Sequence, residues 1–316
     1  MIEFVLRRLA AALPVLLLVS LISASIMQLV PGDPAAVIAG QNATDEQVAQ
    51  IREQLGLNRP FPVKLAAWYV DLAHGDLGRS ILLNRPVLQA IGERVPVTLA
   101  LAGFALLLTV AVGVPCGVVA AIKANTWVDQ AVLTLALVGV SVPNFWLSLM
   151  LIVLFGVMLD WLPAGGYVPF ADDPVGWVRC LILPGFSLAL LQIGLLARIT
   201  RTTVLEVLQQ DFIRTARAKG LPSWLVVGKH VLKNVLVPVV TVIGISFGLL
   251  LSGSVVIETV YSIPGMGRLL ANAIFGRDYP LIQGGLLVTA AVLVLLNLVV
   301  DVLYAVIDPR IQYDQR

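Results

Sequence analysis

Charged residues are scarce in this 316-residue chain, since Asp, Glu, Lys and Arg together make up 13% of it. A soluble domain usually carries about 25% charged residues. Histidine and cysteine are scarcer still, with two of each. His74 and His230 lie in different polar segments, and Cys116 and Cys180 lie within or beside apolar ones. This spacing predicts no metal site, disulfide or catalytic pair, and the composition argues against a soluble protein.

Two motifs that would supply chemistry are also missing. The sequence contains no G-x-x-x-x-G-K-[ST] phosphate loop and no H-E-x-x-H zinc motif. Ion-coupled carriers usually bury ionisable groups at mid-membrane, whereas Glu258 and Asp301 stand toward the ends of apolar runs. We therefore expect no catalytic residue, no metal and no cofactor in this chain, and an energy source outside it.

Long apolar runs fill most of the sequence, which is 59% hydrophobic with a mean hydropathy of +0.93. A run of about 20 apolar residues can cross a bilayer as a helix. Six such runs cover residues 9–30, 97–122, 131–159, 181–197, 235–257 and 281–307. They lack the strict alternation of barrel strands, and the first is longer than a usual signal-peptide core. The sequence predicts an all-α polytopic membrane protein with six transmembrane helices.

The distribution of Lys and Arg sets the expected orientation. With the N-terminus in the cytoplasm, twelve basic residues lie on the inner side and three, Arg179, Arg268 and Arg277, in short outer loops. This satisfies the positive-inside rule and places both termini in the cytoplasm. The chain then divides into an N-terminal segment with the first span, an external loop, a core of five spans and a cytoplasmic tail, at residues 1–30, 31–96, 97–307 and 308–316.

The external loop is patterned as a small helical cap. "TDEQVAQIREQLGL" begins at residue 44 with a capping residue, Thr44 or Asp45, and continues with apolar residues at helical spacing. Gly56 is a suitable stop for this helix.

The longest expected cytoplasmic segment runs from residue 198 to residue 234. Its second half, "DFIRTARAKGLPSWLVVGKHVLKN" at 211–234, holds five Lys or Arg residues. The composition predicts a helix that ends at Gly220, with Pro222 beyond it, and a second helix capped by Ser223. The basic residues are either solvated charges that touch anionic lipid or part of a knob on which a partner docks.

This segment resembles the coupling loop of ABC importer membrane subunits, whose general pattern is E-A-A, three residues, Gly, nine residues and I-x-L-P. Arg214, Thr215 and Ala216 stand at E-A-A, and Gly220 and Leu232 match; His230 takes the Ile place and Lys233 replaces Pro. "RTARAKG" with "KHVLKNVLVPVVT" is similar to the dipeptide, oligopeptide and nickel branch, in which these departures are typical. Motifs that agree with this branch cover nearly the whole chain. They are "LVPGDPA" at 29–35, "LGLNRP" at 55–60, "GDLGRSI" at 75–81, "SVPNFWL" at 141–147, "VVIETVYSIPGMGRLL" at 255–270, "RDYPLIQG" at 277–284 and "VDVLYAVIDPRI" at 300–311.

The resemblance implies an ABC importer type I permease fold in a bacterial cytoplasmic (inner) membrane. It also implies a second homologous permease subunit, two cytoplasmic ATPase subunits and an extracytoplasmic solute-binding protein as partners, and no nucleic acid. The residues that it assigns to ATPase coupling are Phe212, Arg214, Thr215, Ala216, Arg217, Lys219, Gly220, His230 and Leu232. The basic ones would pair with acids on the ATPase or remain solvated.

Two further sets of residues are candidates within the membrane part. Pro143 and Asn144 break the third apolar run, and with Gln192 and Ser246 they are expected to line the translocation path; a simple structural bend is the alternative. Pro264, Gly265, Met266 and Gly267 have a turn composition and are expected at the outer mouth. The pairs Gly113 with Gly117 and Gly244 with Gly248 predict close helix packing.

The sequence leaves the cargo open. Members of the branch that it resembles handle dipeptides, longer peptides, glutathione, nickel chelates, opines or sugars. Di- or oligopeptides, including glutathione-like ones, are the expectation. An ion-coupled secondary carrier and a receptor or scaffold without transport are the rival classes, and only the six spans speak for either.

Overall fold

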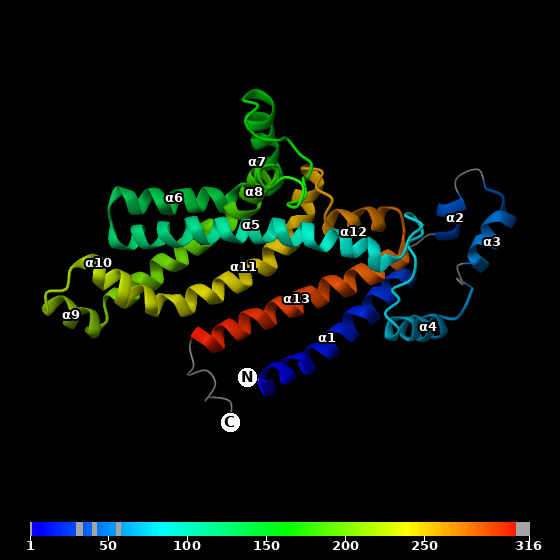
Figure 1. The fold of residues 1–316 in the computed structure, drawn as a ribbon, viewed down its shortest axis with the longest axis horizontal. Coiled ribbons are helices and arrows are strands. Elements are labelled where there is room, and N and C mark those ends of the chain that lie inside the picture. Colours follow the sequence, from blue (N-terminus) through cyan, green and yellow to red (C-terminus); the bar gives the residue numbers. More distant parts are fainter. Residues whose placement is uncertain (1, 30–33, 40–42, 55–57, 308–316) are drawn as a thin grey trace. The chain divides into compact units, whose positions relative to one another are not determined.

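The computed structural model describes residues 2–29, 34–39, 43–54 and 58–307, and every regular element in these ranges is helical (Figure 1). The chain forms two compact units, residues 1–97 with 265–295 and residues 98–264 with 296–316. Parts of the quoted motifs at 29–35, 44–57, 55–60 and 300–311, Gly56 among them, and the predicted tail 308–316 lie outside the described residues.

The first unit contains the segment predicted to be external and an apolar cluster at the start of the membrane core. Its helices are α1 (Ile2–Leu29), α2 (Pro34–Ala39), α3 (Asp45–Gln54), α4 (Phe61–Ala73), the start of α5 (Val87–Ile122), α12 (Met266–Phe275) and the first part of α13 (Tyr279–Ile307). The buried cluster joins the loop before α5 to α5, α12 and α13. Its residues are Leu77, Val87, Ala90, Ile91, Met266, Leu269, Ala273, Tyr279, Leu281 and Ile282.

The helix expected in the external loop is present as α3, and its start is as predicted. Backbone N–H of Gln47 donates to Thr44 Oγ1 over 3.4 Å, and backbone N–H of Thr44 donates to Gln47 Oε1 over 3.0 Å. This reciprocal pair satisfies two backbone donors at the helix start.

Two motifs that are almost 200 residues apart in sequence meet in the first unit. Ser80 Oγ donates to Asp278 Oδ2 over 2.5 Å, and backbone N–H of Leu82 donates to the same oxygen over 3.0 Å. Asp278 is fully buried, and its Oδ1 also accepts from backbone N–H of Leu281 in the first turn of α13. A carboxylate with three donors is a stable buried group. The Ser80 loop is thereby fixed to the start of α13.

The second unit contains the rest of the membrane core, with α8 in contact with most of its helices. Its elements are the rest of α5, α6 (Trp127–Ser141), α7 (Asn144–Leu151), the π-helix η1 (Ile152–Met158), α8 (Pro174–Leu208), α9 (Asp211–Ala218), α10 (Ser223–Leu225), the π-helix η2 (Val226–Val231), α11 (Leu232–Val260) and the end of α13. Helix α8 packs against α6, α7 and α11.

Glycines allow the helices around α8 to approach closely. A Cβ atom added at Gly117 of α5 would lie 2.5 Å from the carbonyl oxygen of Ala197 and 2.6 Å from Thr200 Cβ, both in α8. One added at Gly194 of α8 would lie 2.7 Å from the carbonyl oxygen of Ala136 in α6. The predicted packing at Gly113 and Gly117 is therefore confirmed.

The second predicted glycine pair gives a mixed result. A Cβ at Gly244 of α11 would lie 2.5 Å from Val300 Cγ1 in α13, whereas one at Gly248 would meet nothing within 4 Å. Close packing is confirmed at Gly244 alone, so Gly248 is not constrained by a neighbouring helix of the described chain.

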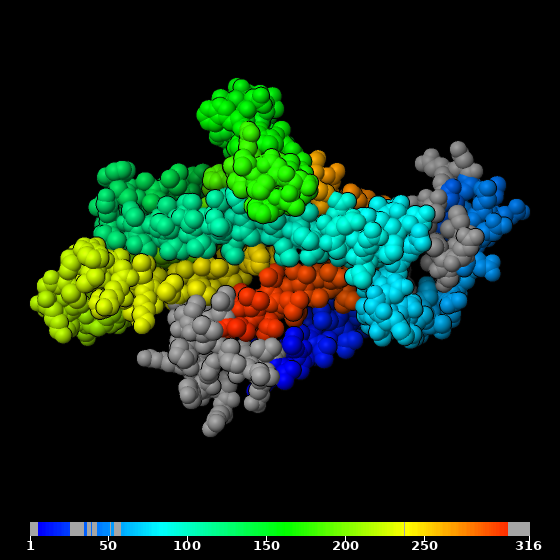
Figure 2. Space-filling model, in the orientation of Figure 1, coloured from blue at the N-terminus to red at the C-terminus, as the bar shows by residue number. Residues whose placement is uncertain are grey.

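The third predicted span, 131–159, is not one continuous helix. Helix α6 ends at Ser141, and the segment Asn144–Met158 leaves it at an angle of 101°, so that it projects beyond its neighbours (Figure 2). Pro143 lacks a backbone donor and disfavours the helical conformation of the residue before it, so Val142 is extended, with φ −83° and ψ 122°. The described residues thus contain five single helices able to cross a membrane, or six spans if the bent pair counts as one.

The fourth predicted span, 181–197, is too short at both ends. Helix α8 begins at Pro174, where the Asp173 side chain caps it by accepting from backbone N–H of Val175, and it continues to Leu208. Its 35 residues extend about 52 Å at 1.5 Å per residue. The segment expected as a loop from residue 198 therefore starts with about three more helical turns.

We predict that Gly117→Ala destabilises the α5–α8 contact, because its methyl group has no space against the α8 backbone. Overpacking of this kind typically costs 1–3 kcal/mol. The matched control is Gly103→Ala in the same helix, where an added Cβ meets nothing within 4 Å. Unfolding in an SDS titration should shift to lower detergent fraction for Gly117→Ala only. Equal midpoints for both variants would contradict the packing described here.

Candidate docking loop and polar contacts of the membrane core

A short helix, α9, follows α8 after a sharp change of direction. Gln210 is extended, with φ −68° and ψ 147°, and α9 then occupies Asp211–Ala218. With α10 it lies at one end of the helices of the second unit (Figure 1). The predicted helix that ends near Gly220 is therefore α9, and Gln209 and Gln210 separate it from α8.

One face of α9 is anchored in an apolar cluster. Ile213 is fully buried and Ala216 is 7% exposed. The cluster gathers residues of α5, α8, η2 and α11 around them. These residues are Ala121, Leu196, Val204, Val226, Val231, Val235 and Val239. Ala216, which the resemblance assigned to coupling, therefore contacts the interior of this chain.

The opposite face of α9 is exposed and basic. Phe212 is 44% exposed, and the other outward residues are Arg214, Thr215, Arg217 and Lys219. Arg214 lies 3.4 Å from Asp211 with both side chains largely exposed, an ion pair worth about 0–1 kcal/mol. The coupling residues before Gly220 therefore form one exposed surface, apart from the buried Ala216.

Gly220 ends α9 as predicted, and the geometry shows why glycine stands there. Its φ is +77°, a left-handed conformation that side chains disfavour. Backbone N–H of Leu221 donates to the Ala216 carbonyl over 3.3 Å, and that of Gly220 donates to the Arg217 carbonyl over 2.9 Å. This pair of bonds is a Schellman motif. A Cβ at Gly220 would meet nothing within 4 Å, so the turn is open to its surroundings.

The remaining coupling residues lie on the returning helix. His230 belongs to η2 and Leu232 begins α11, and both are half-buried. The second helix starts at Ser223 as predicted, but Pro222 and not Ser223 holds the capping position. Trp224 is 75% exposed beside the turn.

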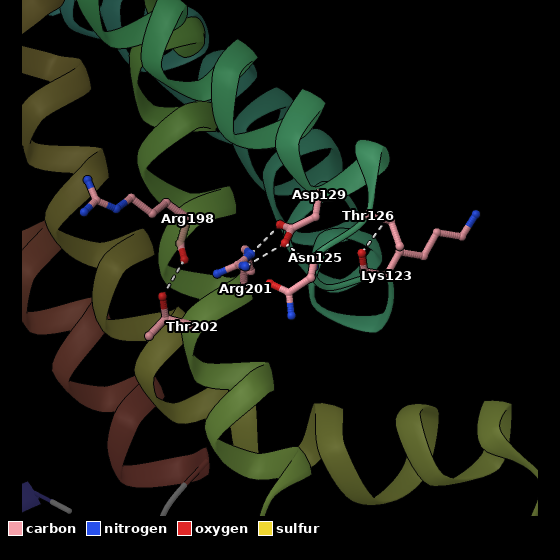
Figure 3. Close-up of polar contacts among 7 residues, drawn as sticks. All are labelled: Lys123, Asn125, Thr126, Asp129, Arg198, Arg201 and Thr202. Atoms are coloured by element: carbon pink, nitrogen blue, oxygen red, sulfur yellow. Dashed lines mark hydrogen bonds and ion pairs between the residues drawn. The ribbon is translucent and has the colours of Figure 1, made fainter.

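An ion pair that the sequence analysis missed ties α8 to the start of α6 (Figure 3). Arg201 Nε and Nη2 donate to Asp129 Oδ1 and Oδ2 over 2.5 and 2.7 Å. The Asp129 side chain is 4% exposed and also accepts from backbone N–H of Asn125 over 2.9 Å. A bidentate pair fixes both distance and orientation. The T-x-x-D pattern that begins at Thr126 marks the start of α6, where Thr126 is the N-cap, but it does not point to Arg201 as the partner of Asp129.

Two of the four expected path residues are in direct contact, and the assignment of all four to the path stays a prediction. Ser246 Oγ of α11 donates to Gln192 Oε1 of α8 over 3.2 Å, and both side chains are buried. Pro143 is exposed and Asn144 half-buried at the break between α6 and α7. Ser246 also stands in a G-x-S-x-G sequence, but that pattern marks a nucleophile only on a strand-to-helix turn, and here it lies inside a helix.

The C-terminal end of α11 is held by a tyrosine whose contacts the sequence did not indicate. The Tyr261 hydroxyl lies 3.0 Å from Ser187 Oγ in α8 and 3.4 Å from the Ser148 carbonyl oxygen in α7. The Tyr261 carbonyl accepts from backbone N–H of Gly166 over 2.8 Å. Tyr261 therefore links α11, α8, α7 and the loop that follows η1.

The residues expected at the outer mouth follow this tyrosine. Pro264 is half-buried, while Gly265, Met266 and Gly267 are buried, Met266 in the cluster of the first unit. A contact of these residues with a receptor stays a prediction. In the described residues no three His, Cys, Asp or Glu side chains are grouped to hold a metal ion.

Comparison with known proteins covers nearly the whole chain. Residues 113–313 match the model of a binding-protein-dependent transport system inner membrane component, and residues 1–102 match the N-terminal model of such a membrane component. A putative peptide transport system permease protein of Brucella abortus is 51% identical over 99% of this chain and 100% of its own length. The dipeptide permease DppB of Alkalihalophilus pseudofirmus and the glutathione permease GsiC of Salmonella choleraesuis are each 42% identical, with the same shares covered.

A solved structure supports the fold. The inward-facing MetNI methionine ABC transporter contains a chain with a TM-score of 0.58 at 18% identity, which covers 70% of this chain and 97% of its own. The family match supports a transport component rather than an enzyme. The chain therefore belongs to the family of multi-pass inner-membrane permease components of binding-protein-dependent ABC importers, in the branch of the peptide permeases.

Proposed function

We propose that this chain forms half of the translocation path for di- or oligopeptides, including glutathione-like ones, in an importer driven by ATP. The names of its relatives support the cargo class, since they are peptide, dipeptide and glutathione permeases at 42–51% identity over 99% of this chain. A second homologous permease subunit completes the path, and an extracytoplasmic binding protein delivers the peptide.

The anchored, exposed helix α9 is the observation that carries the coupling mechanism. Two cytoplasmic ATPase subunits dock on the coupling loops, one of them on the basic face that includes Arg214, Arg217 and Lys219. Because Ile213 and Ala216 are buried among residues of α5, α8 and α11, a displacement of α9 is transmitted to those helices. The Asp129–Arg201 pair extends the connection to α6. The spans then move as rigid bodies between outward-open and inward-open states.

Nickel chelates and opines are the alternative cargo, because the same importer architecture carries them. Calorimetry on the binding protein of this system, with a panel of peptides and with nickel, separates these cargoes. Heat of binding with peptides alone would support peptide import, and binding of nickel alone would replace it.

The first test concerns topology, with both termini in the cytoplasm. Gln47→Cys in α3 and Ser223→Cys at the start of α10 both place a thiol at an exposed position. In a background without Cys116 and Cys180, an impermeant maleimide should label Gln47→Cys from the outside and Ser223→Cys from the inside. Labelling of both from the same face would contradict the proposed orientation.

The second test concerns the energy source. The purified chain should hydrolyse no ATP, because it contains no phosphate-loop motif. Reconstitution with the ATPase subunits should restore hydrolysis. The control is the same complex with the phosphate-loop lysine of the ATPase replaced. This replacement should abolish hydrolysis by the complex. Hydrolysis by the purified single chain, free of contaminating ATPase, would reject the permease assignment.

The third test concerns docking. Gly220→Trp adds bulk to an open turn and forces a side chain into a left-handed conformation, so we expect normal insertion but lost ATP-driven uptake and weaker co-purification of the ATPase. Gly220→Ala separates the two causes, because it adds the strain without the bulk. Arg217→Ala should change uptake much less, since an exposed ion pair is worth about 0–1 kcal/mol. Unchanged uptake by Gly220→Trp with the ATPase fully bound would leave the loop as a basic anchor.

A further inference from the structure

Helix α4 (Phe61–Ala73) is apolar on most of its surface, although it belongs to the segment expected outside the membrane. Lys64 and Asp71 are the charged residues in its sequence, FPVKLAAWYVDLA. Helix α3 in the same segment reads DEQVAQIREQ and is mostly polar. A helix surrounded by water normally carries a polar outer face. The composition of α4 therefore favours an environment other than water on all of its outer surface.

The exposed face of α4 is an apolar stripe. Val63, Ala66, Ala67 and Val70 are all exposed, and their spacing of three, one and three residues places them on one side of the helix. Val63 is 51% exposed and Val70 58%. The stripe therefore presents two large side chains without cover from the described part of the chain.

The charged residues of α4 occupy a different side. Lys64 and Asp71 are seven residues apart, which is almost two full turns, so they share one flank about 90° from the stripe. The half-buried Leu65, Trp68 and Leu72 lie on the side opposite the stripe. Helix α4 thus has a side against the protein, a charged flank and an open apolar face.

A hydrogen bond fixes the height of α4 along the first transmembrane helix. The Tyr69 hydroxyl lies 2.7 Å from Ser20 Oγ, which itself donates to the Leu17 carbonyl, so Tyr69 is the donor. The apolar stretch of α1 runs from Leu6 to Ser25. Ser20 is five residues before its end, or about 7.5 Å inside it. Tyr69 therefore places α4 beside α1 (Figure 1), within the apolar stretch of that helix. In the orientation given under the proposed function, on which this inference rests, that level is the outer leaflet.

We propose that α4 is an interfacial helix inserted in the outer leaflet, with its stripe against lipid acyl chains and its charged flank at the headgroups. The occupant follows from continuity, because α1 at the same depth exposes Leu17, Leu18 and Leu21, the kind of surface that lipid covers. The hydrogen bond between Tyr69 and Ser20 places the apolar stripe of α4 at the same depth as the exposed leucines of α1. This assigns to α4 a membrane-anchoring role beyond the proposed function in transport.

Depth-dependent quenching tests the proposal in the assembled importer. Single cysteines at Val63 and Val70, in a background with Cys116→Ala and Cys180→Ala, are labelled with the fluorophore NBD, and the complex is reconstituted into phosphatidylcholine vesicles with and without brominated acyl chains. Leu17→Cys is the lipid-exposed control and Gln47→Cys the water-exposed one. We expect both α4 positions to lose fluorescence to brominated lipid as Leu17→Cys does, and to resist aqueous iodide, which should quench Gln47→Cys.

Every other result would overturn the proposal. Quenching of the α4 positions by iodide alone would place the stripe in water. Protection from both quenchers would mean that protein covers the stripe, such as the second permease subunit.

Two matched substitutions that each introduce a charge add a second readout. Ala67→Asp should lower the amount of assembled complex in membranes, while Ala49→Asp on the exposed surface of α3 should not. Equal amounts for the two variants would reject insertion of α4.

Discussion

The close packing of helices in the second unit depends on a few glycines, because they have no Cβ atom. Gly117 brings the α5 backbone against α8, and Gly194 brings α8 against α6. In a bilayer, association between helices relies on such close contact, because lipid is as apolar as the side chains and gives no hydrophobic driving force. The buried polar contacts are built on this packing. Asp129 reaches Arg201 and Gln192 reaches Ser246 only because their helices lie close together.

The two faces of α9 in the docking loop differ, since one is buried and apolar and the other is exposed and basic. Its interior residues, Ile213 and Ala216, belong to the same apolar cluster as residues of α5, α8 and α11, so the short helix is part of the core. Its exterior is basic and ends in an open turn at Gly220. A helix of eight residues is too short to be stable alone. Its order therefore depends on the transmembrane helices that it would move.

Much of this organisation could be predicted from local sequence. The apolar runs gave the all-helical fold, Gly220 gave the end of α9, and Thr44 gave the start of α3. Local patterns did not predict contacts between residues that are far apart in the sequence. Nothing near Arg201 in the sequence indicates its pairing with Asp129, and nothing near Asp278 indicates its bond with Ser80. The break at Pro143 was visible in the sequence, but neither its angle of 101° nor the packing of α7 against α8 and α11 could be predicted from local sequence.

The break in the third span also changes how this part of the protein fits its membrane. Helix α6 has 15 residues, so it extends only about 22 Å, against about 30 Å for the hydrocarbon core of a typical bilayer. Helix α6 alone is thus shorter than the hydrocarbon core, and hydrophobic mismatch costs a fraction of a kcal/mol for each ångström. A thinner bilayer fits the length of α6 better. In a thicker bilayer, the apolar side chains of α7 and η1 must supply the remaining contact with the lipid acyl chains. The angle at Pro143 thereby makes membrane thickness a physical variable for this subunit.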